Sequence, residues 1–234
     1  MCNKYLSNTA TASFIIDMLY QYGVKYACIS PGSRNTPLTN KLITESKIHC
    51  FSHIDERSCA YFGLGIAKTS NNPVIILTTS GTATANLFPA VIEASINKIP
   101  LIFITADRPK RLINTGDSQT IDQVNLFGSH VRNFIDINPQ NKLIKKQLNQ
   151  MDSLMNDCKG LNKKIPGPIH MNIRFEEPLL DEGKDTIRNK RKIVKEKIIK
   201  TTFKLPKFKN ALIVLGPQNS QKEIKYIIAF SKKI

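Results

Sequence analysis

The chain has 234 residues, of which 34 are Lys or Arg and 18 are Asp or Glu, so its formal net charge is +16 at pH 7. An apolar fraction of 41% is enough to bury a core and excludes wholesale disorder. No run approaches the roughly 18 uncharged apolar residues of a membrane span, and the start lacks the basic and apolar pattern of a secretion signal. We therefore expect a soluble, unsecreted protein with one large domain, or one domain and part of a second.

The positive charge is concentrated in the second part of the chain. Residues 1–140 hold 12 basic and 9 acidic residues, a net charge of +3, whereas residues 141–234 hold 22 and 9, a net charge of +13. The densest stretch, Lys184–Lys209, is either an arm that binds nucleic-acid phosphates or a solvated connector. Lys outnumbers Arg 26 to 8, and few aromatic residues are interleaved, so we favour the connector and do not expect nucleic acid as a partner.

The cysteines and histidines show no pattern typical of a disulfide framework or a metal site. The five cysteines are an odd number without a CxxC pair, and the four histidines are scattered. We expect reduced thiols that are mostly buried, and no metal ligands among these residues.

Helix-period stretches alternate with short apolar runs over the first 175 or so residues. The expected helices cover about 9–22, 37–45, 55–68, 82–97, 121–127 and 141–158, with Thr9 as the first N-cap. The expected strands cover about 25–29, 48–51, 74–79, 101–105, 131–137 and 168–173. Strands that are apolar throughout are typical of a parallel sheet covered on both faces. The alternation predicts an α/β doubly wound, mostly parallel domain over residues 1–179.

The remainder of the chain is too short for a second complete domain. Residues 180–210 are interpreted as a basic linker, 211–215 as a buried strand and 221–230 as a helix. One strand and one helix cannot close a core. We therefore interpret residues 211–234 as the first β-α unit of a second α/β domain that is truncated.

Ligands of doubly wound sheets bind beyond the carboxyl ends of the strands, so the strand-to-helix turns are the places to search. Ser30–Arg34 combines backbone N–H groups with a guanidinium, which suits a carboxylate or a phosphate. The alternative is a Pro-Gly turn followed by an exposed arginine. In His53–Ser58, one acid either exchanges a proton with a bound ring nitrogen or merely opposes the helix dipole. The spacing alone does not decide between these interpretations.

Two further turns are rich in small or polar residues. Thr78–Ala83 can form an anion or cofactor cradle, but it is neither a GxSxG elbow nor a GxxxxGK phosphate loop. Arg108 and Gln119, in Thr105–Pro109 and Gly116–Gln123, could grip a polar ligand or simply belong to an ordered loop. Cys59 is interpreted as a packed thiol rather than a nucleophile.

Together these turns resemble one enzyme family. The strings are SPGSRNTPL (30–38), HIDERS (53–58), TTSGTATANLFPAVIEA (78–94), PLIFITADRP (100–109), GDSQTIDQ (116–123) and GPIHMNIRFEEPL (167–179). They are similar to the N-terminal part of the MenD family, the 2-succinyl-5-enolpyruvyl-6-hydroxy-3-cyclohexene-1-carboxylate synthases. These are thiamine-diphosphate enzymes of menaquinone and phylloquinone biosynthesis. The match spans about residues 8–179 in the expected order.

The resemblance implies a protein of three α/β domains, of which the first binds the aminopyrimidine of thiamine diphosphate. Glu56 matches the glutamate that hydrogen-bonds a pyrimidine nitrogen, and this contact lets the cofactor ring take up a proton. Ser80 and Gly81 match the loop that lies against the cofactor. The family's reaction is a C–C bond-forming transfer: 2-oxoglutarate is decarboxylated, and the succinyl unit is added to isochorismate.

Both substrates carry two carboxylates, so fixed cationic forks are needed to bind them. Arg34 and Arg108 match family positions for substrate binding, as do Ser33 and Gln119. The residue before Gln119 is Ser118, where many members have Asn. This departure predicts that one substrate hydrogen bond is rearranged.

The resemblance also indicates what the chain lacks. In the family, Mg²⁺ and the diphosphate are held by a GDG motif and a following Asn in the third domain, and this sequence contains no GDG. The active site forms between subunits of a homodimer or homotetramer, so we expect the chain alone to be inactive. A bacterial cytoplasm or a plastid stroma would fit. Two alternatives remain: a domain of another thiamine-diphosphate decarboxylase or acetolactate-synthase-like enzyme, and a non-catalytic binding fragment.

Overall fold

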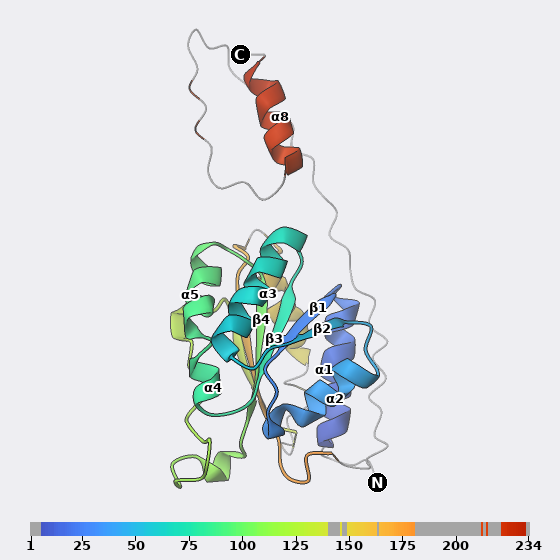
Figure 1. Ribbon diagram of the computed structural model, residues 1–234, viewed down its shortest axis with the longest axis vertical. Helices are drawn as coiled ribbons and strands as arrows, with labels where there is room; N and C mark the ends of the chain where they lie inside the picture. Colours follow the sequence, from blue (N-terminus) through green and yellow to red (C-terminus); the bar gives the residue numbers. More distant parts are fainter. Residues whose placement is uncertain are drawn as a thin grey trace. The chain divides into compact units, whose positions relative to one another are not determined.

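A computed structural model describes residues 6–139, 146, 149–162, 164–180, 212, 214 and 221–232. The chain divides into two compact units, Met1–Arg191 and Lys192–Ile234. The first contains a six-stranded sheet with the strand order β2-β1-β3-β4-β6-β5, in which every neighbouring pair is parallel (Figure 1). The described part of the second contains one helix, α8 (Gln221–Ser231).

The strands and helices alternate along the first unit as the sequence predicts. The strands are β1 (Tyr26–Ile29), β2 (His49–Ser52), β3 (Val74–Thr78), β4 (Leu101–Asp107), β5 (Phe134–Ile137) and β6 (Ile169–Arg174). The α-helices are α1 (Asn8–Gln21), α2 (Thr36–Thr44), α3 (Glu56–Ser70), α4 (Thr82–Ala85), α5 (Phe88–Ile96) and α7 (Met151–Lys159). Three 3₁₀ turns cover Ser33–Asn35, Lys110–Leu112 and Gly128–His130. The predicted doubly wound α/β fold is confirmed.

The sheet is covered by helices on both faces, and each face has its own apolar cluster. Alternate residues of β3 divide between them: Ile75 and Leu77 pack with α1, α2 and α7, whereas Val74 and Ile76 pack with α3 and α5. Figure 1 shows α1 and α2 on the opposite side of the sheet from α3 and α5. Because β3 and β4 are buried on both faces, their apolar runs in the sequence are continuous rather than alternating. This burial fixes the sheet and therefore the positions of its carboxyl ends.

Two details of the predicted helices are corrected at their ends. The first N-cap is Ser7 rather than Thr9, because the Ser7 hydroxyl accepts a hydrogen bond from the Ala10 N–H at 3.0 Å. The predicted helix 82–97 is two helices, α4 and α5. Pro89 lies in the first turn of α5, where its missing N–H costs nothing, but it could not continue α4.

The predicted helix 121–127 is wrong, since residues 121–123 have no regular structure and residues 124–127 form turns. Asn125 has a φ of 53°, a left-handed conformation that cannot continue a right-handed helix. Farther along, the predicted helix 141–158 is found as α7, which begins at Met151, and residues 141–145 lie outside the described residues.

The predicted helix 221–230 is confirmed as α8. Leu212 and Val214 belong to no strand and are 88% and 83% exposed, so the buried strand predicted for 211–215 is wrong at these two residues. A strand needs a neighbour for its N–H and C=O groups, and the described residues of this unit provide none. The other residues of that strand, and linker residues 181–210, lie outside the described residues. The predicted domain boundaries stay a prediction.

Four of the five cysteines lie in the described part of the chain, and all four are free. Cys28, Cys59 and Cys158 are buried, and Cys50 is half-buried. Burial raises the pKa of the Cys28 thiol to about 12 and that of Cys59 to about 11, so these side chains stay protonated at neutral pH. This favours the interpretation of Cys59 as a packed thiol; Cys2 lies outside the described residues.

A buried polar network crosses the sheet at the carboxyl ends of β4, β5 and β6. Arg174 Nη1 lies 3.0 Å from Asp107 Oδ2, and the side chains are 3% and 0% exposed. Asn172 Nδ2 donates to Asp107 Oδ2 and to Asp136 Oδ1, both at 2.8 Å. Burial raises the pKa of Asp107. The network also holds the backbone of Arg108, whose N–H donates to Asp107 at 2.7 Å and whose C=O accepts from Arg174 at 3.2 Å.

Gln123 connects this network to the turn after β3. Its buried side chain accepts from the Gly81 N–H at 2.8 Å and donates to Asn172 Oδ1 at 2.9 Å. Gly81 has a φ of +80°, and a Cβ there would lie 2.9 Å from the backbone oxygen of Gln119. The turn after β3 therefore packs directly on the backbone of the 116–123 loop, which only glycine allows.

We expect Gly81→Ala to destabilise the chain by about 1–3 kcal/mol, because the new Cβ meets both an unfavourable φ and the Gln119 carbonyl. Gly65→Ala is the matched control. Gly65 lies inside α3 with open space around its Cβ position, so there alanine should be neutral or stabilise by up to about 1 kcal/mol. Urea unfolding of the three proteins measures both effects. Equal effects of the two substitutions would contradict this account of the turn.

His170 on β6 is a buried histidine without a charged partner. Its ring lies 4.6 Å from Phe127 and 5.0 Å from Phe134 between centroids, and Nε2 lies 2.8 Å from Thr105 Oγ1. Burial lowers its pKa from 6.5 to about 3. The folded chain therefore holds this ring neutral over a pH range in which the unfolded chain protonates it.

Between pH 6.5 and about 3 the unfolded state binds a proton at His170 that the folded state does not bind. The free energy of unfolding therefore falls as the pH drops through this range, by about 1.4 kcal/mol per pH unit from this residue. Replacing His170 with Gln removes this contribution, so we expect a shallower loss of stability between pH 6 and 4. Urea unfolding at several pH values gives the two slopes. Parallel slopes would show that His170 does not titrate in this way.

Candidate functional site

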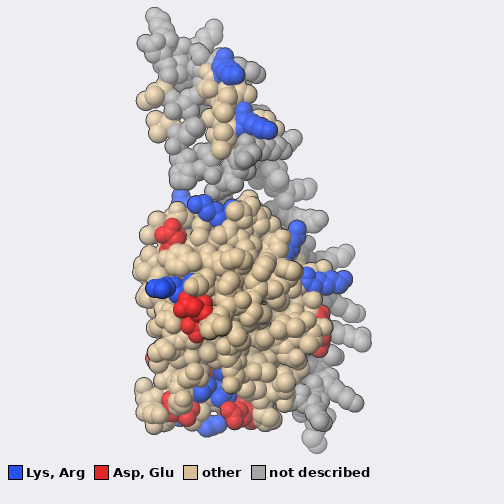
Figure 2. All heavy atoms as spheres, in the orientation of Figure 1, with Lys and Arg blue, Asp and Glu red and all other residues tan. Residues whose placement is uncertain are grey.

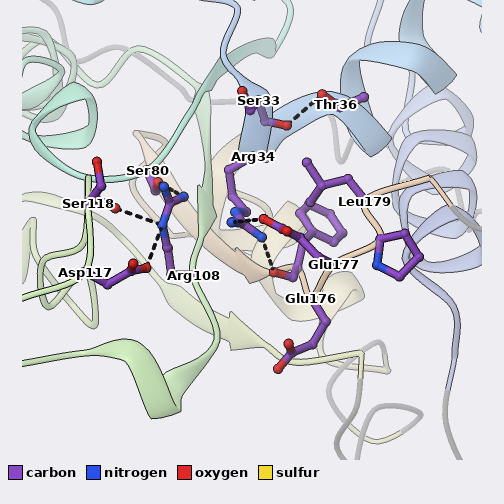
Figure 3. A network of polar contacts seen from close by, with 12 residues as sticks. Ser33, Arg34, Thr36, Ser80, Arg108, Asp117, Ser118, Glu176, Glu177 and Leu179 are labelled. Carbon is purple, nitrogen blue, oxygen red and sulfur yellow. Dashed lines mark hydrogen bonds and ion pairs between the residues drawn. The ribbon is translucent and has the colours of Figure 1, made fainter. Parts of the chain in front are cut away.

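Arg34 lies in the 3₁₀ turn after β1, and its side chain is only 8% exposed. Nη1 donates to the Phe175 carbonyl at 3.0 Å, and Nη2 donates to Glu177 Oε1 at 2.9 Å (Figure 3). Its Nε is buried without a hydrogen-bond partner among the described residues. The turn itself is tied to the helix that follows, because Thr36 Oγ1 donates to the Ser33 carbonyl at 2.6 Å. Arg34 is thus a fixed cation with unused hydrogen-bonding capacity.

Arg108 follows β4 and is held by three contacts from two loops (Figure 3). Its Nη1 donates to Ser80 Oγ at 3.0 Å, and its Nε donates to the Ser118 carbonyl at 2.9 Å. Asp117 Oδ2 lies 3.3 Å from the same Nε. The side chain is 12% exposed. Ser80, Arg108 and Ser118, which the sequence predicts as site residues, are therefore in direct contact.

Arg34 and Arg108 line one pocket of about 320 Å³. Its other charged lining residues are Arg111, Asp117, Glu176 and Glu177. Arg111 Nη2 forms an ion pair with Glu176 Oε2 at 2.8 Å. Figure 2 shows side chains of both signs next to one another at the lower end of the domain. The pocket combines fixed guanidinium groups with carboxylates, which suits a small ligand that carries negative charge.

No role was predicted from the sequence for Arg111, Glu176 or Glu177. The signal available was a pair of adjacent glutamates shortly after the last predicted strand of the domain, at the edge where ligands bind. Their pairing with particular arginines depends on β6 lying next to β4, which neighbouring residues in the sequence do not reveal.

Glu56 is the first residue of α3 and is half-buried. Asp55 is the N-cap: its side chain accepts from the Ser58 N–H at 2.7 Å, and the hydrogen bonds from Ser58 lower the pKa of Asp55. Glu56 instead accepts from Asn86 Nδ2 at 3.0 Å. Capping of α3 thus falls to Asp55, and Glu56 is left with a neutral partner. Glu56 does not line the arginine pocket.

Ser33 and Gln119 are less engaged than the other predicted site residues. Both are exposed, and neither side chain makes a hydrogen bond to another described residue. Gln119 adopts a φ of 51°, and its backbone lies against Gly81. The structure thus places their side chains at the surface and leaves their binding roles as predictions.

A search of the described residues finds no group of three or more His, Cys, Asp or Glu side chains that could hold a metal ion. None of the described helices is both long and apolar enough to cross a membrane.

Curated relatives share this part of the chain. The 2-succinyl-5-enolpyruvyl-6-hydroxy-3-cyclohexene-1-carboxylate synthase of Halobacterium salinarum is 43% identical over 175 residues, covering 74% of this chain and 30% of the relative. The enzyme of the same name from Listeria innocua is 46% identical over 167 residues, covering 70% and 28%. That of Trichodesmium erythraeum is 42% identical over 172 residues, covering 74% and 30%. The chain therefore spans less than a third of the length of these relatives.

A family model also matches residues 9–126, which include the turns that carry Arg34, Glu56, Gly81 and Arg108. The family is described as the N-terminal TPP binding domain of thiamine pyrophosphate enzymes. The match covers half of the chain and agrees with the parallel α/β sheet of the structure. The chain belongs to this family of N-terminal, TPP-binding domains of thiamine pyrophosphate enzymes.

Proposed function

We propose that this chain is the pyrimidine-binding part of a thiamine-diphosphate-dependent synthase. In the complete enzyme, 2-oxoglutarate would be decarboxylated and its succinyl unit added to isochorismate. The names of the similar enzymes support this reaction. The observation that carries the proposal is the pocket in which Arg34 and Arg108, both nearly buried, lie together. Two guanidinium groups in one small pocket match substrates that each carry two carboxylates.

Glu56 and the turn at Gly81 fit the pyrimidine half of the cofactor. Asn86 contacts only one oxygen of the Glu56 carboxylate, so Oε1 is available to a ring nitrogen. Gly81 has no side chain between the β3 turn and the 116–123 loop, and even a Cβ would be too close to Gln119 there. When bound, thiamine diphosphate would supply the electron sink for decarboxylation. Glu56 would hold or exchange the proton at the ring nitrogen.

Arg34 and Arg108 would orient the substrate rather than take part in proton transfer. Their guanidinium groups are held by neighbouring backbone and hydroxyl oxygens and offer planar, forked donors to a carboxylate. Ser33, Ser118 and Gln119 lie on the turns around them, and we retain them as proposed substrate contacts. We assign no residue of this chain to Mg²⁺.

The remaining properties are proposed from the resemblance. They are small-molecule substrates, a site completed by a second subunit in a homodimer or homotetramer, and a bacterial cytoplasm or plastid stroma as the compartment.

The role of Glu56 is tested with thiamine as the probe, titrated into the labelled chain and followed by NMR. Glu56→Gln should weaken thiamine binding by at least about tenfold, because a charged hydrogen bond contributes roughly 1.5–3 kcal/mol. Glu93→Gln is a matched control, since Glu93 is also a helical glutamate that accepts from an asparagine, Asn97 Nδ2, at 2.7 Å. The control should bind like the unchanged chain. If both substitutions weaken binding equally, or neither does, Glu56 does not contact the pyrimidine.

A further inference from the structure

Each arginine of the pocket is paired with a carboxylate of the chain itself. Arg34 pairs with Glu177 at 2.9 Å, Arg108 with Asp117 at 3.3 Å, and Arg111 with Glu176 at 2.8 Å. The formal charges of these six residues cancel. A ligand with negative charge therefore does not enter a free cationic pocket: it must take the place of at least one internal carboxylate.

The three pairs differ in which partner is fixed. The side chain of Arg34 is 8% exposed, whereas that of Glu177 is 72% exposed. In the Arg111–Glu176 pair the order is reversed, because the arginine is 66% exposed and the glutamate 33%. Glu177 is therefore already largely solvated when it separates from the fixed Arg34. Separation of Glu176 would instead free an exposed arginine, Arg111. A ligand carboxylate that takes the place of Glu177 leaves the buried Arg34 paired and moves only the exposed Glu177 into water, so the exchange costs little.

Arg34 stays in position without Glu177. Its Nη1 remains bound to the Phe175 carbonyl, and its turn is held by Asn35, which donates to the Ser30 carbonyl at 2.9 Å and accepts from the Gly32 N–H at 3.1 Å. The vacated Nη2 and the unpartnered Nε are adjacent donors of one planar group. A ligand carboxylate in place of Glu177 would meet a preorganised fork.

We propose that Glu177 is an internal competitor for the carboxylate site on Arg34: a dicarboxylate ligand binds by replacing Glu177, which sets the affinity of the pocket. This inference rests on the proposed function, which makes dicarboxylates the ligands. A carboxylate that merely replaces Glu177 exchanges one ion pair for a similar one. A ligand with a second carboxylate has a further group for the Arg108 side of the pocket, and therefore a net gain.

The test uses succinate as the probe and the 234-residue chain as it is. Binding is followed by the ¹⁵N NMR signal of the Arg34 Nε–H at constant ionic strength, in the unchanged chain, in Glu177→Gln and in Glu176→Gln. The two variants each remove one negative charge from the same pocket, so their difference isolates direct competition at Arg34. We expect succinate to bind about two- to fivefold more tightly to Glu177→Gln than to Glu176→Gln. This is the change in affinity expected from the loss of one competing, weak ion pair.

Equal affinities of the two variants would overturn the proposal, because bulk charge would then explain any change. Succinate binding that Glu177→Gln leaves unaltered would also overturn it, yet would leave the pocket as a dicarboxylate site and the proposed function in place. Absence of any succinate-dependent shift at Arg34 in all three proteins would overturn both.

Discussion

The buried ion pair between Asp107 and Arg174 is the interaction on which the site depends. Two charges that are 0% and 3% exposed would be costly to bury unless each were paired and hydrogen-bonded. The Asp107 carboxylate meets this requirement with Arg174, the Asn172 amide and the Arg108 N–H. These contacts of the Asp107 carboxylate fix the end of β4 against β6. Both backbone polar groups of Arg108 are hydrogen-bonded to this pair, which fixes the backbone from which its side chain extends.

The same network reaches the turn after β3. Asn172 accepts from the Gln123 amide, and Gln123 in turn accepts from the Gly81 N–H. These hydrogen bonds join two loops. The turn after β3 carries Ser80, which holds Arg108, and the 116–123 loop carries Gln119, whose backbone lies against Gly81. Buried polar networks are stabilising only when their members are satisfied together. The turn after β3 and the arginine pocket therefore share one support, so we expect a change in one loop to affect the other.

The sequence is informative where burial alone decides the structure. Strands β3 and β4 are mostly apolar because they are covered on both faces, and they were predicted within about two residues. The helix predicted for 121–127 failed because Gln123 uses its side chain to bind β4 and β6 instead of facing solvent, and Asn125 adopts a positive φ. Arg34 and Arg108 were identified one by one from their motifs. Their partners Glu177 and Asp117 were not. The pairing of Arg34 with Glu177 follows from the strand order, and that of Arg108 with Asp117 from the course of the loop after β4, and neither is visible in local spacing.

The structure also separates the acids that pair with arginines from Glu56. A carboxylate in an ion pair with an arginine is poorly suited to exchange a proton with a ligand. Ion pairs of this kind are formed by Asp117, Glu176 and Glu177. Glu56, at the start of α3, lies outside the arginine pocket, and its hydrogen-bond partner is the neutral Asn86. Asp55 takes over the capping of that helix, which leaves Glu56 free of the role that an acid in a first turn usually has. The acids that pair with arginines therefore line the pocket, whereas Glu56 lies outside it with a neutral partner.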